Sequence, residues 1–187
     1  MFPYKINDHI TLRLVTENDS EALFSLVTKE RQHLRKWLPW VDSTTLSTYS
    51  ELIPIWIKQY EEKAGLQAAI LYDNVIIGMI GLHSIQWQNS QTSIGYWLSE
   101  RYEGKGIMTK CVEALLHYTF HENGLERVEI RCGQGNVKSN RIPIKLGFTH
   151  EGTARHAEFL YDHYHDLEVY SLLHEEWKSL HIKKTPL

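Results

Sequence analysis

One stretch of the chain decides the fold: Ile94-Gly95-Tyr96-Trp97-Leu98, then Ser99-Glu100-Arg101-Tyr102-Glu103-Gly104-Lys105-Gly106-Ile107-Met108-Thr109. It passes from an alternating strand through a glycine turn into a helix, from about Met108 to Glu122, whose apolar residues recur at helical spacing. The first amides of a helix have no acceptor within it, and the helix dipole adds positive charge there. Because glycines lack Cβ atoms, a phosphate group can approach the main chain closely. The stretch therefore predicts a phosphate site at Gly104-Lys105-Gly106.

The glycine turn alone does not distinguish a phosphate site from an ordinary helix start. The dinucleotide-binding fingerprint requires a third glycine, but position 109 is threonine. The phosphate loop of nucleotide hydrolases requires Gly-Lys-Ser/Thr after four intervening residues, and this stretch lacks that pattern. The sequence of the turn alone therefore leaves both a phosphate site and an ordinary helix start open.

Strand and helix signals on either side indicate a mixed α/β fold. Strands are expected at residues 10–15, 66–72, 75–83, 92–98, 125–132, 148–159 and 168–174, and helices after a Thr16–Asp19 capping box and at 46–63, 108–122 and 140–146. Asp73-Asn74 predicts a tight hairpin turn between two of these strands. Strands and helices do not alternate regularly, which argues against a doubly wound dinucleotide fold.

Length and composition narrow the class of protein. The 187 residues fit a single domain, 1–187, with a core from about 8 to 175 and a short C-terminal tail. A formal charge of −3 argues against a direct nucleic-acid partner. Cys111 and Cys132 lie in apolar segments, so we expect buried free thiols rather than disulfides. The sequence shows neither a secretory signal nor an apolar run of membrane length, which predicts a cytoplasmic protein with no membrane contact.

Eleven histidines raise the question of a metal site. His117 and His121 lie four residues apart on the predicted long helix, and His163 and His165 flank Tyr164 in a polar turn. A metalloprotease helix would carry glutamate directly after the first histidine, but position 118 is tyrosine. Because neither pair has a convincing third ligand, we expect no bound metal.

The stretch from Ile94 to Thr109 resembles the Gcn5-related N-acetyltransferase (GNAT) family, and within it the branch that acetylates the N-termini of ribosomal proteins. Further segments match that branch in the same order along the chain: Ile10-Thr11-Leu12-Arg13-Leu14, Trp37-Leu38-Pro39-Trp40, Asn136-x-x-Ser139, Lys145-Leu146-Gly147-Phe148 and Asp166 to Leu172. The resemblance implies the acyl-CoA N-acyltransferase fold. This fold is a mixed, mostly antiparallel sheet of about seven strands flanked by helices, with two strands splayed at a notch for acetyl-CoA.

The resemblance also implies where acetyl-CoA (CoA as cosubstrate) binds. Main-chain groups of Trp97 and Leu98 would bond the pantetheine arm as if it were another strand. The pyrophosphate would be held by the amides of Gly104, Lys105, Gly106, Ile107, Met108 and Thr109. Glu103 and Met108 break the family pattern Arg/Gln-x-x-Gly-x-Gly/Ala at both ends. We therefore expect binding through backbone amides, with the Glu103 carboxylate turned away from the phosphate.

Asn136 and Ser139 match positions that in this branch contact the cofactor and face its sulfur. Amine attack on a thioester expels a thiolate, which a hydroxyl donor stabilises, so Ser139 is the candidate catalytic donor. The alternative for Ser139 is a helix N-cap, a role that serine favours, and the sequence supports the two roles equally. Pro143 lacks an amide donor, so the predicted helix begins as late as Asn140.

The candidates for a base lie on the acceptor side. The resemblance places Glu158, His165 and Asp166 near the acceptor side, and His83, at the end of the middle strand, is a further candidate. An α-amino group needs only a modest base, and no residue type marks that base by itself. Asp166 has a structural alternative, because its carboxylate could fix the loop through backbone hydrogen bonds.

Trp37, Trp40 and Tyr96 are the candidates for an aromatic acceptor wall, although loop tryptophans are also often partial core. The resemblance implies direct transfer of acetyl from acetyl-CoA to a primary amine, with a protein N-terminus as acceptor. A small-molecule amine, such as a polyamine or an aminoglycoside, is the alternative acceptor. A non-catalytic CoA-binding regulatory protein is the alternative class. Exposed sheet edges near the C-terminus allow a homodimer.

Overall fold

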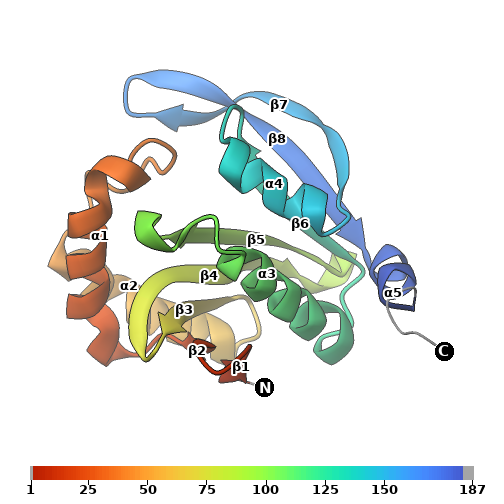
Figure 1. The fold of residues 1–187 in the computed structure, drawn as a ribbon, viewed down its shortest axis with the longest axis horizontal. Coiled ribbons are helices and arrows are strands. Elements are labelled where there is room, and N and C mark those ends of the chain that lie inside the picture. Colours follow the sequence, from red (N-terminus) through yellow and green to blue (C-terminus); the bar gives the residue numbers. More distant parts are fainter. Residues whose placement is uncertain (1, 183–187) are drawn as a thin grey trace.

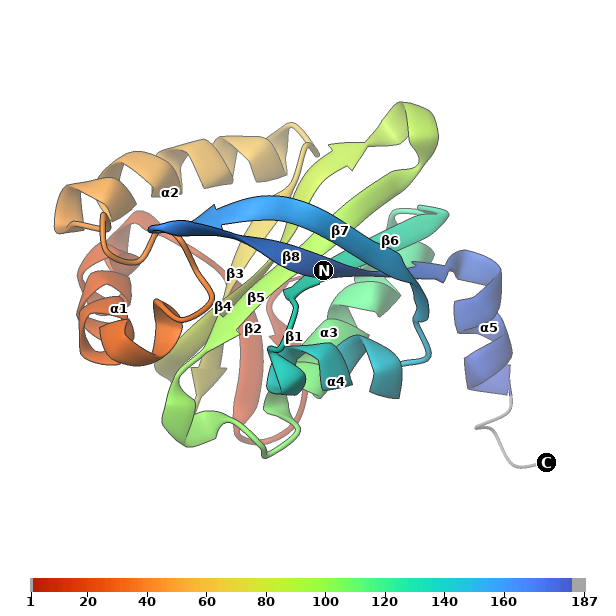
Figure 2. The same ribbon diagram turned by 90° about the horizontal axis from the view of Figure 1, so that it is seen from above.

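The computed structural model describes residues 2–182, and its centre is one twisted sheet with helices against it (Figure 1; Figure 2). The strands are β1 (Tyr4–Lys5), β2 (Ile10–Leu14), β3 (Leu66–Tyr72), β4 (Val75–Gln86), β5 (Gln91–Leu98), β6 (Arg127–Gly133), β7 (Thr149–Leu160) and β8 (His163–Leu173). The helices are α1 (Ser20–Leu34), α2 (Leu46–Glu61), α3 (Ile107–His117), α4 (Val137–Lys145) and α5 (His174–Ile182). Shorter helical turns are η1 (Glu17–Asp19), η2 (Trp87–Asn89), η3 (Glu100–Tyr102) and η4 (Tyr118–Glu122).

The sheet runs in the order β1-β2-β3-β4-β5-β6-β8-β7, and each neighbouring pair is antiparallel except β5 with β6. In that parallel pair the register joins only Gln91, Thr92 and Ser93 to the first residues of β6. β5 continues to Leu98 and β6 to Gly133, so the two strands part beyond Ser93. The mixed, mostly antiparallel sheet with splayed strands is confirmed, and it has eight strands over the described residues rather than about seven.

Two hydrophobic cores lie on opposite faces of the sheet. The larger core contains the apolar face of α3, where Leu115 and Leu116 are buried. Figure 2 shows α1 and α2 together, away from α3. The smaller core contains buried residues of α1 and α2 together with Trp97 of β5. Leu98, the next residue, belongs to the larger core. Because successive strand side chains point to opposite faces, the side chains of Trp97 and Leu98 anchor β5 in the two cores. The main chain at the end of β5 is left facing the notch.

Two local sequence signals are confirmed. Asp73 and Asn74 have φ values of 48° and 65°, as a hairpin turn between β3 and β4 requires. The Asp19 carboxylate accepts a hydrogen bond from the Thr16 amide at 2.7 Å and closes the expected capping box before α1.

Helix α4 differs from the sequence prediction. It begins at Val137 because the Asn136 side chain accepts from the Ser139 amide at 3.2 Å and caps it. The expected start at Asn140 is therefore wrong, and Ser139 is not the N-cap. Pro143 lies inside the helix. Proline has no amide to bond the Ser139 carbonyl four residues earlier, and that carbonyl accepts the Tyr96 hydroxyl at 3.3 Å instead.

The end of the chain carries more structure than the predicted short tail. Residues 174–182 form α5, and Trp177 in its first half is only 2% exposed, close to Phe120. Trp177 and the stacking of His174 on Phe120 tie this helix to the core, and a sequence of this length gives little periodic signal. No helix over residues 2–182 is long and apolar enough to cross a membrane.

Candidate active site

Three polar side chains meet in the notch between β5, β6 and α4. Ser139 Oγ lies 3.2 Å from the Tyr96 hydroxyl oxygen and 3.2 Å from Cys132 Sγ. Because the Tyr96 hydroxyl donates to the Ser139 carbonyl, the single Ser139 hydroxyl proton goes to the tyrosine oxygen or to the sulfur. Burial raises the pKa of Tyr96 well above its usual value, and burial also raises the pKa of Cys132. Tyr96 and Cys132 therefore stay protonated near neutral pH, and Ser139 is a donor that can change partners.

The glycine turn leaves open space in front of the α3 N-terminus. Gly104 and Gly106 have φ values of 71° and 72°, a region that favours glycine. A Cβ atom built on either residue would meet nothing within 4 Å. Helix α3 begins at Ile107, so its first amides point into this space without intrahelical acceptors. The turn fits a pyrophosphate group held by main-chain donors.

The Glu103 carboxylate is held by two side chains from other elements. One oxygen lies 2.8 Å from His33 Nε2 of α1, and the other lies 2.6 Å from Lys138 Nζ of α4. The ammonium group of Lys105 lies 5.2 Å from the centre of the Tyr102 ring. The acidic residue that breaks the family pattern is thus paired with cations or donors, and does not stand alone beside the turn.

Trp37 and His165 pack together over the end of β6. A Cβ atom on Gly133 would lie 2.9 Å from Trp37 Cε3 and 3.2 Å from His165 Cε1. Glu158 Oε2 lies 2.8 Å from His165 Nε2. A carboxylate can only accept, so Nε2 carries the proton, and in the neutral ring Nδ1 holds the free lone pair. The His165 side chain is 12% exposed and that of Glu158 is 34% exposed, so the ring is largely shielded while the carboxylate still meets solvent.

The β7–β8 hairpin reaches over to the loop that follows α1 (Figure 1). The Tyr161 hydroxyl, at the hairpin turn, donates to the Leu38 carbonyl at 2.7 Å. Arg35 lies 4.7 Å above the Tyr161 ring and forms an ion pair with Asp42 at 2.8 Å. These contacts fix the segment that carries Trp37 relative to the strands that carry His165.

Comparisons with known proteins agree with this geometry. A family model described as an acetyltransferase (GNAT) domain matches residues 9–149. The chain belongs to the GNAT family. It is similar to a protein of Bacillus subtilis (strain 168) named putative ribosomal N-acetyltransferase YdaF, with 42% identity over 96% of this chain and 99% of the relative. GNAT members are acetyl-CoA-dependent N-acetyltransferases, so this chain is such an enzyme.

Two solved GNAT structures are also similar to it. One is RimL, described as a ribosomal L7/L12 alpha-N-protein acetyltransferase in complex with coenzyme A that is joined to a cysteine by a disulfide. Its TM-score is 0.87 at 27% identity, covering 92% of this chain and 98% of that one. The other is the microcin C7 self-immunity acetyltransferase MccE in complex with acetyl-CoA and AMP. Its TM-score is 0.85 at 29% identity, covering 91% of this chain and 96% of that one.

Other candidates in this GNAT chain lie apart from the notch or are engaged elsewhere. Trp40 packs near Trp97 in the smaller core, with ring centres 6.3 Å apart. Asp166 Oδ1 accepts the His156 amide at 2.7 Å, which supports its alternative role in fixing the loop. The His83 ring lies over Gly95, where a Cβ atom would be 2.2 Å from His83 Cε1.

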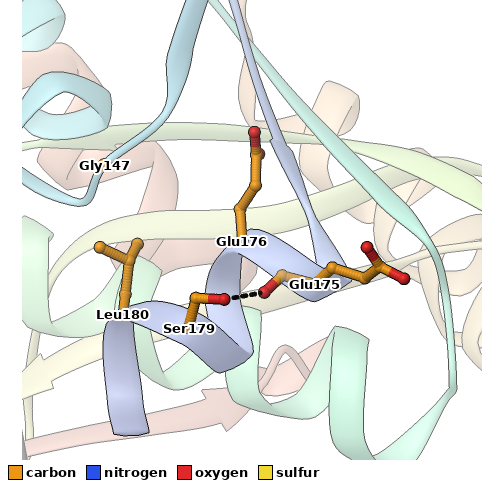
Figure 3. A pocket seen from close by; sticks show the side chains of 5 residues that line it. All are labelled: Gly147, Glu175, Glu176, Ser179 and Leu180. Carbon is orange, nitrogen blue, oxygen red and sulfur yellow. Dashed lines mark hydrogen bonds between the residues drawn. The ribbon is translucent and has the colours of Figure 1, made fainter. Parts of the chain in front are cut away.

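A surface hollow of this chain lies apart from the notch (Figure 1). Figure 3 shows it beside α5, lined by Gly147, Glu175, Glu176, Ser179 and Leu180. Ser179 Oγ donates to the Glu175 carbonyl at 2.9 Å, so its polar groups serve the helix itself. Figure 1 places α5 at the end of the sheet opposite α1, away from the loop that carries Trp37.

The predicted histidine pairs have other partners. The His117 and His121 rings lie 4.7 Å apart, and His117 Nδ1 is 3.0 Å from the Tyr4 hydroxyl. His163 pairs with Asp162, and His165 with Glu158. Across residues 2–182, no group of three or more histidine, cysteine, aspartate or glutamate side chains is arranged to hold a metal ion.

Proposed function

We propose that this enzyme transfers acetyl from acetyl-CoA to the N-terminal α-amine of a ribosomal protein, in the cytoplasm and by direct attack in a ternary complex. The names of YdaF and RimL support this acceptor class. The observation that carries the proposal is the placement of Ser139 and His165. Ser139 contacts the Cys132 side chain, while His165 packs over Gly133, and consecutive strand residues face opposite sides of a sheet.

On the cofactor side, the main chain is the binding surface. The end of β5, at Trp97 and Leu98, faces the notch that β6 leaves, which suits a pantetheine arm. The amides from Gly104 to Thr109 take the pyrophosphate. Asn136 caps α4 with its side-chain oxygen, and we assign its amide nitrogen to the cofactor.

Acetyl transfer then needs a proton acceptor on one side of the notch and a donor on the other. His165 Nδ1 takes a proton from the ammonium group of the acceptor, and the Glu158 carboxylate stabilises the imidazolium that forms. The neutral amine then attacks the thioester carbonyl, and the amide bond forms as the carbon–sulfur bond breaks. Ser139 turns its hydroxyl from Tyr96 to the sulfur that leaves as a thiolate. Cys132 borders the same space, in line with the disulfide between coenzyme A and a cysteine in RimL.

A small-molecule amine is the second candidate acceptor, because MccE, a microcin self-immunity enzyme, is similar over nearly the whole chain. The two acceptors call for different shapes: a peptide needs a groove that stays open at both ends, while a small amine needs a closed cavity. The homodimer is also a prediction. Its natural contact would be β7, the edge strand of the sheet.

The test offers acetyl-CoA and the purified enzyme three kinds of acceptor. These are peptides copying ribosomal-protein N-termini, the same peptides with a blocked α-amine and an added lysine, and a panel of polyamines and aminoglycosides. We expect acetylation, measured by thiol release and located by mass spectrometry, on the free α-amine only. Faster turnover of a small amine than of any peptide would overturn the proposed acceptor.

A further inference from the structure

An acidic residue directly before a phosphate-binding turn needs a physical explanation. The N-terminus of α3 attracts any nearby anion, so the Glu103 carboxylate is a rival for the same amides that would hold a pyrophosphate. A carboxylate left unpaired in the residue directly before the turn would also repel the phosphate by direct charge interaction. Glu103 therefore either weakens cofactor binding or is neutralised.

The contacts of Glu103 show how it is restrained. His33 Nε2 donates to Oε1 at 2.8 Å, and Lys138 Nζ donates to Oε2 at 2.6 Å, so each oxygen is drawn to a different helix. The side chains of Glu103 and His33 are 21% and 15% exposed, whereas that of Lys138 is 68% exposed, so solvent screens the Lys138 pair more than the His33 pair. The hydrogen bond to Glu103 raises the pKa of Lys138. Lys138 directly precedes Ser139, so the ion pair joins α4 to the glycine turn.

We infer that Lys138 and His33 are positioning residues, which neutralise Glu103 and hold its carboxylate away from the α3 N-terminus so that the cofactor pyrophosphate can bind there. The inference rests on the proposed cofactor site at the glycine turn. Lys138 acts through Glu103 in this account, and not as a direct phosphate ligand. Removing Glu103 should therefore make Lys138 dispensable.

A double-mutant cycle on coenzyme A affinity tests this dependence. We expect Lys138→Met to raise the Kd for coenzyme A about tenfold, because it leaves Glu103 charged and less restrained. In the Glu103→Gln background the same substitution should change Kd by less than about twofold. Lys145→Met, an exposed lysine of the same helix, is the matched control and should behave like wild type.

An acetyl donor that lacks the pyrophosphate separates an effect on phosphate binding from a general loss of enzyme function. Acetyl-pantetheine has no pyrophosphate, so we expect Lys138→Met to change its kcat/KM by less than about twofold. An equal loss with both donors would overturn the inference. So would an equal Lys138→Met penalty in both Glu103 backgrounds, which would make Lys138 a direct phosphate ligand. Failure of the wild-type enzyme to bind coenzyme A would refute the cofactor site itself, whereas binding without coupling would refute only this inference.

Discussion

The two sides of the notch differ in the groups they present: main-chain amides on one side and side chains on the other. On the proposed cofactor side, a glycine turn and the first turn of α3 follow each other in the chain, and the proposed ligand donors are main-chain amides. On the proposed acceptor side, Trp37, Glu158 and His165 come from distant segments, and the contacts are made by their side chains. The difference teaches that cofactor affinity should tolerate most single side-chain changes there, whereas acceptor chemistry should not.

Replacing His165 with glutamine should have the largest effect. Glutamine can keep a hydrogen bond to Glu158 but cannot take a proton, so we expect kcat to fall about 100-fold. The Kd for acetyl-CoA, measured by calorimetry, should stay near the wild-type value. His163→Gln, two residues earlier and exposed, is the control. A similar loss in both variants would remove His165 from the role of base.

Replacing Ser139 with alanine tests the opposite side of the notch. We expect kcat to fall about tenfold with little change in coenzyme A affinity, because the leaving sulfur loses one donor. Thermal stability should hold, since Asn136 and not Ser139 caps α4. Asn136→Ala should instead destabilise the protein by about 1 kcal/mol. A loss of stability in Ser139→Ala without a change in kcat would contradict the assignment.

Adding one methyl group at Gly133 disturbs the acceptor side alone. The new Cβ atom would lie 2.9 Å from the Trp37 ring and 3.2 Å from His165, so both must shift. We expect the KM for the acceptor peptide to rise about fivefold, with the KM for acetyl-CoA unchanged. Parallel rises in both constants in steady-state assays would show that the two sides are not independent.

The smallest effect concerns stability, on a part of the sheet that serves neither side. Hydrogen bonds from Arg127 and Ser171 lower the pKa of Glu151 to about 2 from its usual 4.5. The ionised group therefore adds stability above pH 4.5, and that stability is lost as the pH falls from 4.5 towards 2. Because this side chain is 40% exposed, we expect Glu151→Gln to cost only about 0.5 kcal/mol at pH 7. Thermal melts should show that the difference in stability between the wild-type enzyme and Glu151→Gln shrinks below pH 4. A difference that does not change with pH would contradict the ion pair.

The sequence predicted the cofactor side well because its signals are local. The alternation of β5, the glycine turn and the period of α3 all lie within neighbouring residues, and the structure has each of them. The hairpin at Asp73-Asn74 was predictable for the same reason. Local signals were weaker at α5 and β1, which are short elements held by tertiary contacts.

The acceptor side was predictable only as a list of candidates. Nothing in the sequence indicates that His165 meets Glu158, or that Trp37 covers Gly133, because these contacts depend on the bend of the β7–β8 hairpin. The Glu103 contacts with His33 and Lys138 were missed likewise, since the three residues belong to different elements. The sequence flagged Glu103 as a departure, and only the fold shows how it is accommodated.

Pro143 leaves helix α4 without one of its backbone hydrogen bonds. Alanine at this position would restore a hydrogen bond of α4, and alanine is a better helix former than proline. A chain selected for thermal stability alone would therefore not keep proline there. The Ser139 carbonyl that proline leaves unbonded is the anchor of the Tyr96 hydroxyl across the notch. If the notch is the site of acetyl transfer, an alanine at Pro143 would strengthen the helix while competing with Tyr96 for this carbonyl, so a gain in stability would be expected to disturb the site.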